Sequence, residues 1–408
     1  MKRALLVLVG CAGAELVATT PATGPGGDSG SASPLVSEGA EQVDDPTAPL
    51  EQGEAIDTGA AGEPVSQIEP VAVEPASDAA PSAGGDTREV WLKGSTHVHA
   101  KASGDSSEPN PQVIAWYEQR HYDFIVLTDH NRVSELEPRA STRGKVTLRD
   151  PSRGLIVFSG IELTHNPVGC LPAGDPSRNC RIHVNLIGPT ARPAGRIEWA
   201  ERKSHLRLDM YRAALAAQAA LGGLAQVNHP QWLWGMTPDL LAELSQRGLR
   251  LFEVANSAFS KWNAGDAVHP STEALWDAAL ARGATLWGTA SDDAHDYNGH
   301  GKYPPGGGWV AVRARRDPRA ILAALAAGRF YASNGVVLEH AEVDAGALVV
   351  GVDPAATGRY VIDFIENGKR VASIAGRSAR RPLPARGYVR AVVTRDDGKR
   401  AWVQPARM

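Results

Sequence analysis

From residue 90 onward, short apolar runs rich in β-branched residues alternate with longer segments whose apolar residues recur at helical spacing. The apolar runs predict strands at 90–96, 123–128, 155–161, 182–187, 223–228, 249–255 and 285–289. Ala- and Leu-rich segments between some of them predict helices at 111–120, 196–221, 238–247 and 271–282. Alternating strands and helices imply parallel strands joined by right-handed crossovers. We therefore predict an α/β fold in the form of a distorted seven-stranded (β/α) barrel.

The hydrophobic pattern changes after residue 295. Residues 309–314 predict one more strand, and residues 317–328 predict an amphipathic helix that ends at a glycine C-cap. From residue 336 onward, short strand-like runs are separated by hairpin signals such as Asn367-Gly368 and Asp397-Gly398. We predict two folded parts, the barrel at 89–335 and a small antiparallel β-sandwich at 336–408.

Polar side chains follow most of the apolar runs of the predicted barrel. His97 and His99 close the first strand, and both imidazoles aim at one spot because side chains at i and i+2 share a face. The later runs are followed by Asp129, His130, Glu162, His183, His229, Asp292, Asp293 and His295. Strand ends of a (β/α) barrel meet at one face, where catalytic groups lie. We expect these side chains to converge there.

Converging imidazoles and carboxylates are the ligands that divalent transition metals prefer. A hydrogen-bonded core histidine is the commoner explanation for any single one of them. Six histidines together with Glu162 and Asp293 favour a metal site instead. The remaining histidines fall in predicted helices or loops and are interpreted as bystanders, with His300 as a candidate substrate contact: His121, His165, His205, His269, His300 and His340.

The composition separates an acidic N-terminal region from a basic body. Residues 12–88 are rich in Ala, Gly, Pro and Ser and hold too little apolar surface to fold, which predicts a disordered acidic linker. From Trp91 onward, 39 Lys and Arg face 31 Asp and Glu, a net charge of +8. A basic body favours a small anionic substrate or an anionic surface, and scattered solubilising charge explains it equally well. No run of Lys and Arg is typical of a nucleic-acid groove, so we expect no nucleic-acid partner.

The first eleven residues combine Lys2 and Arg3 with a short apolar run that ends at Cys11. This pattern predicts a secretory signal, and Leu8-Val9-Gly10-Cys11 resembles the bacterial lipobox, whose cysteine is lipidated. We expect an exported lipoprotein, anchored in a membrane through its N-terminus and facing the periplasm or the cell surface. The alternative is a start codon placed inside a longer gene.

Two further cysteines bracket a polar loop. Cys170 and Cys180 could close residues 171–179 with a disulfide in an oxidising compartment. A pair of metal thiolates is the alternative, but CxxC spacing is absent. We favour the disulfide.

The ordered set of strand-end residues resembles the PHP (polymerase and histidinol phosphatase) superfamily of metal-dependent hydrolases. The first His-x-His, the Thr128–Asn131 segment, the strand-ending Glu162, two single histidines and the final Asp-x-His match in order, over about residues 91–331. Residues 326–335 and 401–405 look like the CehA/McbA-type branch, which appends a small β domain.

The resemblance implies a site for two or three divalent metal ions. His97, His99, Glu162 and Asp293 would hold the first ion. Glu162 would bridge to a second ion, held also by His183 and His229. A third ion would be held by Asp105, His130 and His295. Asp292 and Asp129 are interpreted as neighbours that brace the ligands.

Such a site predicts hydrolysis by a metal-activated water, because two ions about 3.5–4 Å apart activate a water and clamp the oxygens of an in-line displacement. Mixed nitrogen and oxygen ligands fit Zn, Mn or Fe. Asp105 and His295 are candidate catalytic groups for protonating the leaving group, with a metal-bound water as the alternative. Arg132, Arg181 and Lys302 are candidate substrate-binding residues. Trp232, Trp234, Trp262 and Tyr297 could form an aromatic wall, and the alternative is that they pack as loop residues over the barrel mouth.

A third ion suits a phosphoryl group, so we expect a phosphoesterase. The alternatives are a hydrolase of carbamates or carboxylic esters on the same metals, and a non-catalytic surface-binding lipoprotein.

Overall fold

The computed structural model describes residues 88–134, 154–193, 195–200 and 203–408. The predicted signal at 1–11 and nearly all of the predicted linker at 12–88 lie outside the described residues. The described strands form one sheet of 13 strands and a second, antiparallel sheet of three. The prediction of a mixed α/β fold with a small antiparallel β part is confirmed at this level.

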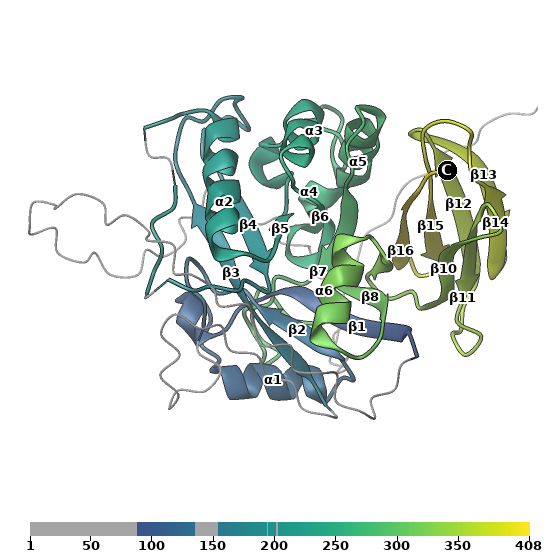
Figure 1. Ribbon diagram of the computed structural model, residues 1–408, viewed down its shortest axis with the longest axis horizontal. Coiled ribbons are helices and arrows are strands. Elements are labelled where there is room, and N and C mark those ends of the chain that lie inside the picture. The colour runs from purple at the N-terminus through teal and green to yellow at the C-terminus, as the bar shows by residue number, and fades with distance from the viewer. Residues whose placement is uncertain (1–87, 135–153, 194, 201–202) are drawn as a thin grey trace, which may run out of the picture. The chain divides into compact units, whose positions relative to one another are not determined.

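The seven strands predicted for the barrel lie side by side in sequence order within the large sheet (Figure 1). They are β1 (Val90–Val98), β2 (Phe124–Leu127), β3 (Ile156–His165), β4 (Ile182–Ile187), β5 (Leu224–Val227), β6 (Leu251–Asn256) and β7 (Trp287–Ser291). The helices of this part are α1 (Asn110–Glu118), α2 (Arg207–Leu221), α3 (Pro238–Gln246), α4 (Ser260–Ala264) and α5 (Thr272–Ala281). One isolated parallel bridge, Val98 to Ala294, joins the end of β1 to the segment after β7.

The prediction that all seven strands run parallel is wrong for β4. β1, β2 and β3 pair in parallel, as do β5, β6 and β7, but β4 is antiparallel to both of its neighbours. The connection from β3 to β4, residues 166–181, contains no helix, so the chain turns back at the edge where β3 ends. A disulfide between Cys170 and Cys180 closes this connection, as the sequence favoured. The N-terminal end of β4 therefore lies at the same edge as the C-terminal ends of the parallel strands.

Helix α2 begins at Arg207, later than the predicted start at residue 196. The preceding segment is held by the loop that follows β2: the backbone N–H of Ile197 donates to the carbonyl of Asn131, and the Trp199 indole donates to its side-chain oxygen. Leu206 is extended and forms an isolated parallel bridge with Leu171, so α2 begins only after it, although the apolar spacing alone suits a longer helix.

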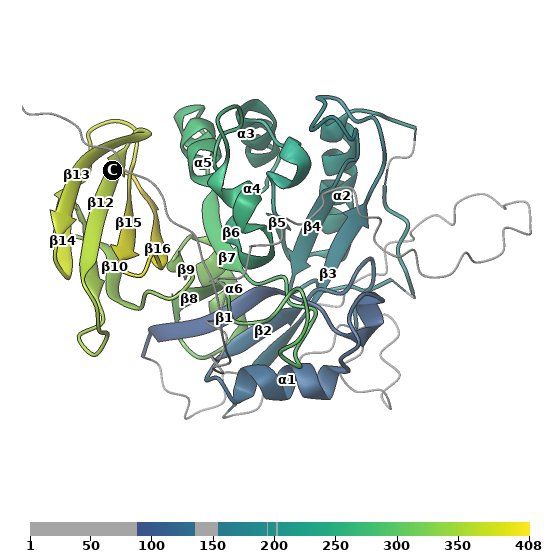
Figure 2. The same cartoon turned by 180° about the vertical axis from the view of Figure 1, so that it is seen from behind.

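The C-terminal part continues the large sheet. β8 (Trp309–Ala314) pairs with β1, and β9 (Phe330–Ser333) follows the helix α6 (Pro318–Ala326) and pairs with β8. The remaining strands of the large sheet are β12 (Tyr360–Glu366), β13 (Lys369–Ala375), β15 (Val389–Arg395) and β16 (Arg400–Ala406), with β16 on β9. The small sheet comprises β10 (Leu338–Asp344), β11 (Ala347–Val352) and β14 (Ser378–Pro382). Strands β10 and β14 are labelled in Figure 2. The predicted boundary at residues 335 and 336 is thus crossed by the β9–β16 pairing.

The apolar core also crosses that boundary. One cluster of buried side chains joins Val98 and Tyr117 to Val350 of the small sheet and Val393 of the large one. The buried guanidinium of Arg390 in β15 donates to both carboxylate oxygens of Asp277 in α5, at 2.7 and 2.6 Å. Paired in this way, a charge can be buried without the large cost of an isolated one.

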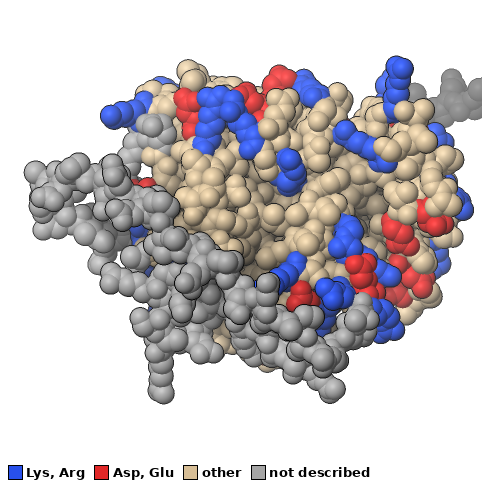
Figure 3. All heavy atoms as spheres, viewed as in Figure 1, with Lys and Arg blue, Asp and Glu red and all other residues tan. Residues whose placement is uncertain are grey.

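Lys and Arg are interspersed with Asp and Glu on the described surface of the face in Figure 3. None of the described helices is long and apolar enough to cross a membrane.

Candidate metal centre

The structure brings all nine predicted metal ligands to one edge of the sheet. His97 and Glu162 lie in β1 and β3, His183 in β4, and the others in the loops that leave strand ends. The antiparallel direction of β4 explains how His183, near the start of its strand, joins residues at the ends of parallel strands. Eight of the nine fall into three groups whose nitrogen and oxygen atoms lie within 4.8 Å of one another. These buried or partly buried groups could hold metal ions.

The first group comprises His97, His99 and Glu162, all buried. Asp293 completes it, because its Oδ1 lies 3.1 Å from the Nε2 atoms of both His97 and His99. The Nε2 of His97 lies 3.3 Å from Oε1 of Glu162. Four donors from three different segments therefore face one point, which matches the ligand set that the resemblance implies for the first ion.

The second group comprises Glu162, His183 and His229. Nδ1 of His183 lies 3.0 Å from Oε1 of Glu162, and Nε2 of His229 lies 3.8 Å from the same oxygen. Glu162 thus belongs to both groups, as a bridging carboxylate requires. The side-chain amide of Asn228 donates to Oε1 of Glu162 at 2.7 Å, and Asn185 in turn accepts from Asn228 at 2.9 Å.

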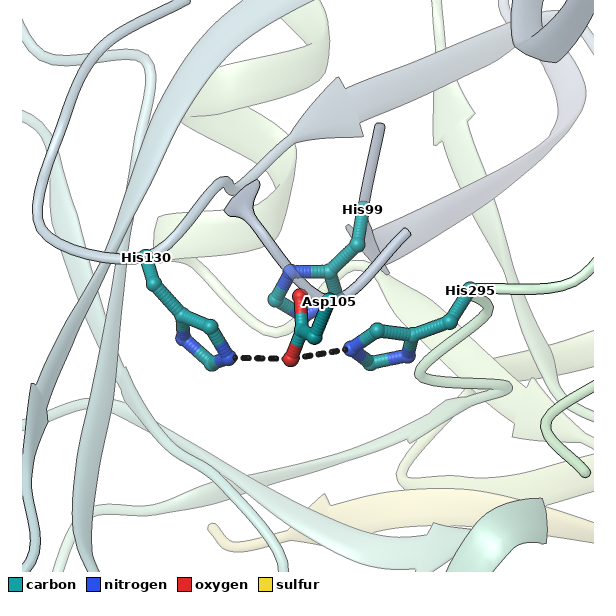
Figure 4. A group of neighbouring side chains, drawn as sticks. All are labelled: His99, Asp105, His130 and His295. Atoms are coloured by element: carbon teal, nitrogen blue, oxygen red, sulfur yellow. Dashed lines mark hydrogen bonds and ion pairs between the residues drawn. The ribbon is translucent and has the colours of Figure 1, made fainter. Parts of the chain in front are cut away.

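The third group comprises Asp105, His130 and His295, and it also includes His99. Oδ2 of Asp105 lies between two imidazoles, 2.9 Å from Nε2 of His130 and 3.1 Å from Nε2 of His295 (Figure 4). The rings of His99 and His295 stack with centroids 4.1 Å apart. Asp105 is the most open member of the centre, with 47% of its side chain exposed against 1% for Glu162.

Several ring nitrogens have hydrogen-bonding partners that leave the other nitrogen free for a cation. Nδ1 of His295 faces the carbonyl of Asp293 at 2.7 Å, and a carbonyl only accepts, so Nδ1 carries the proton. The Nε2 lone pair of the neutral ring then faces the carboxylate of Asp105. Buried Nε2 atoms of His97 and His99 and Oε2 of Glu162 have no hydrogen-bond partner among the described residues. A lone pair facing a carboxylate requires a cation between them, either a proton or a metal ion, so the donors fit a metal centre.

The electrostatics of the centre favour ionised carboxylates and some neutral imidazoles. Burial and the neighbouring His295 lower the pKa of His99 to about 3, and burial lowers the pKa of His183 to about 4 despite Glu162. Burial alone would raise the pKa of Glu162, but nearby His183, His130 and His97 lower it well below its usual value. Neutral imidazoles and charged carboxylates are the forms that bind metal ions.

Two of the proposed ligands sit on backbone that L-residues rarely adopt. His229 and Asp293 have φ values of 24° and 50°. Each is the second residue after a strand, His229 after β5 and Asp293 after β7. Such conformations cost energy and cluster at functional sites, where the surrounding structure enforces them.

Sequence reasoning missed Glu253 in β6, which is fully buried and hydrogen-bonds to His97. Its only signal was a charged residue inside an apolar run. The two acidic neighbours predicted to brace the ligands contact other groups. Asp292 accepts from Ser95, Tyr117 and the backbone of Gly306, and Asp129 accepts from the backbone of Ala100 and from Ser134.

The three predicted substrate-binding cations lie in different surroundings. The guanidinium of Arg181 lies over the ring of Trp232 at 4.9 Å, and this ring contacts the rings of His183 and His229. Lys302 is exposed and lies 5.5 Å from the ring of Tyr303, which packs against His295. Arg132, which follows the His130 loop, lines a cavity of about 290 Å³ with Arg192.

The predicted aromatic wall is divided. Trp232 contacts two of the proposed ligands, whereas Trp234 and Trp262 pack on each other and Trp234 stacks on His269. The hydroxyl of Tyr297 lies 2.9 Å from the carbonyl of His99 and so contacts backbone. Six histidines fall outside the three groups, among them the exposed His300.

Comparison with models of known protein families and with curated proteins gave no match for this chain.

Proposed function

We propose that this protein is a metal-dependent hydrolase of the PHP type, and that its favoured substrates are phosphoesters. In this proposal β1–β7 form the distorted (β/α) barrel, with the Val98–Ala294 bridge at its seam. The observation that carries the proposal is the convergence of six imidazoles and three carboxylates, with Glu162 shared between two groups. A purely structural cluster has no need of buried ring nitrogens that lack a hydrogen-bond partner among the described residues.

Zn, Mn or Fe ions held by these residues would activate water and neutralise charge on the reacting oxygens. His97, His99, Glu162 and Asp293 would hold one ion, and Glu162, His183 and His229 a second. The chain's own part is to fix these donors before substrate arrives, and to exclude water from the buried side, where Glu162 is only 1% exposed. Preorganised donors need little rearrangement during the reaction.

Asp105 and His295 are the proposed groups for protonating the leaving group. Burial would lower the pKa of His295, but hydrogen bonding to Asp105 and the charge of Asp293 raise it in the metal-free protein. Nδ1 of His295 faces the carbonyl of Asp293, and its Nε2 lies 3.1 Å from Asp105, so a proton on Nε2 would be held by Asp105. A third ion held by Asp105, His130 and His295 would take the place of that proton.

A small anionic substrate suits the cations around the centre. Arg181 is half-buried over Trp232, and none of the described carboxylates pairs with it, so its charge is available beside the second group. Lys302 and Arg132 would contact parts of the substrate that lie nearer the third group. We further propose that the protein is exported and held to a membrane by a lipid on Cys11.

A hydrolase screen tests the proposal. Purified protein loaded with Zn, Mn or Fe is assayed against phosphomonoesters, phosphodiesters, carboxylic esters and carbamates, and the metal content is measured in parallel. We expect bound metal, turnover of a phosphoester, and loss of that turnover in His97→Ala. Undiminished turnover in His97→Ala would contradict the mechanism. Turnover of carbamates or carboxylic esters alone would replace the phosphoesterase assignment, and metal binding without turnover of any class would favour a non-catalytic role.

A further inference from the structure

Glu253 is a fully buried carboxylate that lies beside the proposed ligands without being one of them. It comes from the middle of β6, where the pairing with β7 is irregular between Glu253 and Ala255. Irregularities in strand pairing, such as β-bulges, redirect side chains and are common next to active sites. Among the described residues, the only basic side chain within ion-pair distance is His97, at 2.8 Å. A carboxylate in this position must therefore be stabilised by hydrogen bonds.

Both oxygens of Glu253 accept hydrogen bonds, and each oxygen contacts a different part of the centre. Oε1 faces Nδ1 of His97 at 2.8 Å and also accepts from the hydroxyl of Ser291. Oε2 accepts from the backbone N–H of His229 at 2.7 Å and from the side chain of Asn256 at 2.8 Å. The amide of Gln226 approaches Oε1 at 3.4 Å.

The contact with His97 determines which ring nitrogen is free. An ionised carboxylate only accepts, so Nδ1 of His97 must carry a proton. The lone pair of the neutral ring is then on Nε2, the buried atom that lies 3.1 Å from Asp293 and 3.3 Å from Glu162. A carboxylate on the far nitrogen also makes an imidazole a stronger ligand.

The contact with His229 acts through the backbone. His229 has a φ of 24°, an unfavourable conformation that its surroundings must hold. The hydrogen bond from its N–H to Oε2 of Glu253 is one such restraint. It fixes the backbone position from which the His229 side chain extends. One side chain thus fixes a ligand of the first group and a ligand of the second.

We propose that Glu253 is a positioning residue that couples the two buried metal sites by holding the His97 ring and the His229 backbone at once. The inference rests on the metal binding in the proposed function but not on any substrate. Its chemistry depends on two accepting oxygens. A glutamine in this place would turn one of them into a donor that faces either the His97 N–H or the His229 N–H.

The test is metal affinity in the absence of substrate. Glu253→Gln and wild type are titrated with Co²⁺, and binding is followed by calorimetry and by the visible absorption of the ion. The matched control is Thr289→Val, which removes a buried hydrogen bond to the Phe252 carbonyl of the same strand without touching a ligand. We expect E253Q to bind Co²⁺ about 10–100-fold more weakly, and T289V to bind it as wild type does.

Equal affinity of E253Q and wild type overturns the inference. So does an equal loss in T289V, because the effect would then reflect general weakening of β6. If wild type binds no Co²⁺, both the metal centre and this inference are wrong. A further outcome is that E253Q binds metal more weakly than wild type, while wild type binds metal but hydrolyses no substrate. This result would support the inference and contradict only the proposed activity.

A measurement on the unsubstituted chain covers the case in which E253Q fails to fold. In protein with ¹⁵N-labelled histidine and bound Zn²⁺, His97 should be protonated at Nδ1 and metal-bound at Nε2, with its signals assigned by their loss in His97→Gln. Metal binding through Nδ1 of His97 would exclude the proposed contact and sink the inference.

Discussion

The buried and open parts of the candidate metal centre are built in different ways. The buried part, defined here as His97, Glu162, His183, His229 and Asp293, is surrounded by hydrogen-bonding side chains such as Asn228 and Glu253. The open part, defined as Asp105, His130 and His295, depends on one half-exposed carboxylate between two imidazoles. His99 lies between the parts and belongs to a group in each.

The buried part is therefore the rigid one, and the open part is the one that solvent and substrate can reach. Donors that are fully buried and braced can hold an ion tightly, because their orientation costs nothing further when it binds. Donors at the solvent boundary bind more weakly but can exchange protons and reach a substrate. We therefore expect the buried part to hold its metal ions more firmly, and the open part to meet the leaving group.

The largest effect should come from removing the metals. Dialysis against a chelator should abolish hydrolysis, and the ion of the open part should leave before those of the buried part. Metal analysis of timed samples, with activity measured on each, checks this order. Loss of all ions in a single step would contradict the proposed difference between the two parts.

The next largest effect separates the parts by substitution. Glu162→Gln removes the carboxylate shared by two groups, so we expect a loss of metal and activity greater than the roughly 10–100-fold that is typical for an outer partner. Asp105→Asn should lose less bound metal than Glu162→Gln, because it removes only one ligand of the third group. Both are compared by metal content and by kcat/KM. Equal retention of metal in the two variants would show that Glu162 has no bridging role.

The proposed substrate-binding cations should also differ in how strongly they affect KM. Arg181→Met should raise KM for an anionic substrate by about 10-fold, since its half-buried charge is weakly screened. Lys302→Met should raise KM less, because Lys302 is exposed to solvent. Arg178→Met, in the exposed part of the disulfide loop, serves as the control. A larger effect from Lys302 than from Arg181 would place the substrate charge at the open part.

The smallest effect concerns the pH dependence of stability in the metal-free protein. Burial alone would lower the pKa of His130, but Glu162 and Asp105 outweigh this effect and raise the pKa to about 10. A raised pKa gives stability below the unfolded value of about 6.5 that is lost as the pH rises toward 10. The lowered pKa values of His99 and His183 act oppositely and cost stability as the pH falls below 6.5.

Because of His130, the melting temperature of the metal-free protein should fall as the pH rises above 6.5, by about 2–4 °C for each kcal/mol lost. Metal-loaded protein should lack the decline above pH 6.5, because metal ions take the place of the protons. Thermal unfolding of both forms across pH 5–10 measures this, and identical profiles would contradict it.

Much of the fold and of the candidate site could be predicted because both leave local signals. Apolar runs located all seven strands to within a few residues, and the polar residues after them identified His97, Glu162, His229 and the others that the structure brings together. These signals are local because a strand that ends at a polar edge must change from apolar to polar side chains there.

The direction of β4 could not be predicted from local pattern. A six-residue buried strand such as 182–187 has the same apolar run whether it is parallel or antiparallel to its neighbours. The direction depends on the connection that precedes it, which turns back without a helix. The start of α2 at Arg207 has a similar cause, since Leu206 is extended where it pairs with Leu171, a contact that the local sequence does not reveal.

The donor types, their order and their position after apolar runs can be recognised in the chain alone. Which donors share an oxygen, which remain open to solvent, and that Glu253 lies behind His97 follow only from the folded arrangement. Burial and hydrogen bonding join residues far apart in the chain, such as His97 and Glu253, separated by 156 positions. A charged residue inside an apolar run has no local partner, and its role becomes visible only when the folded chain supplies one.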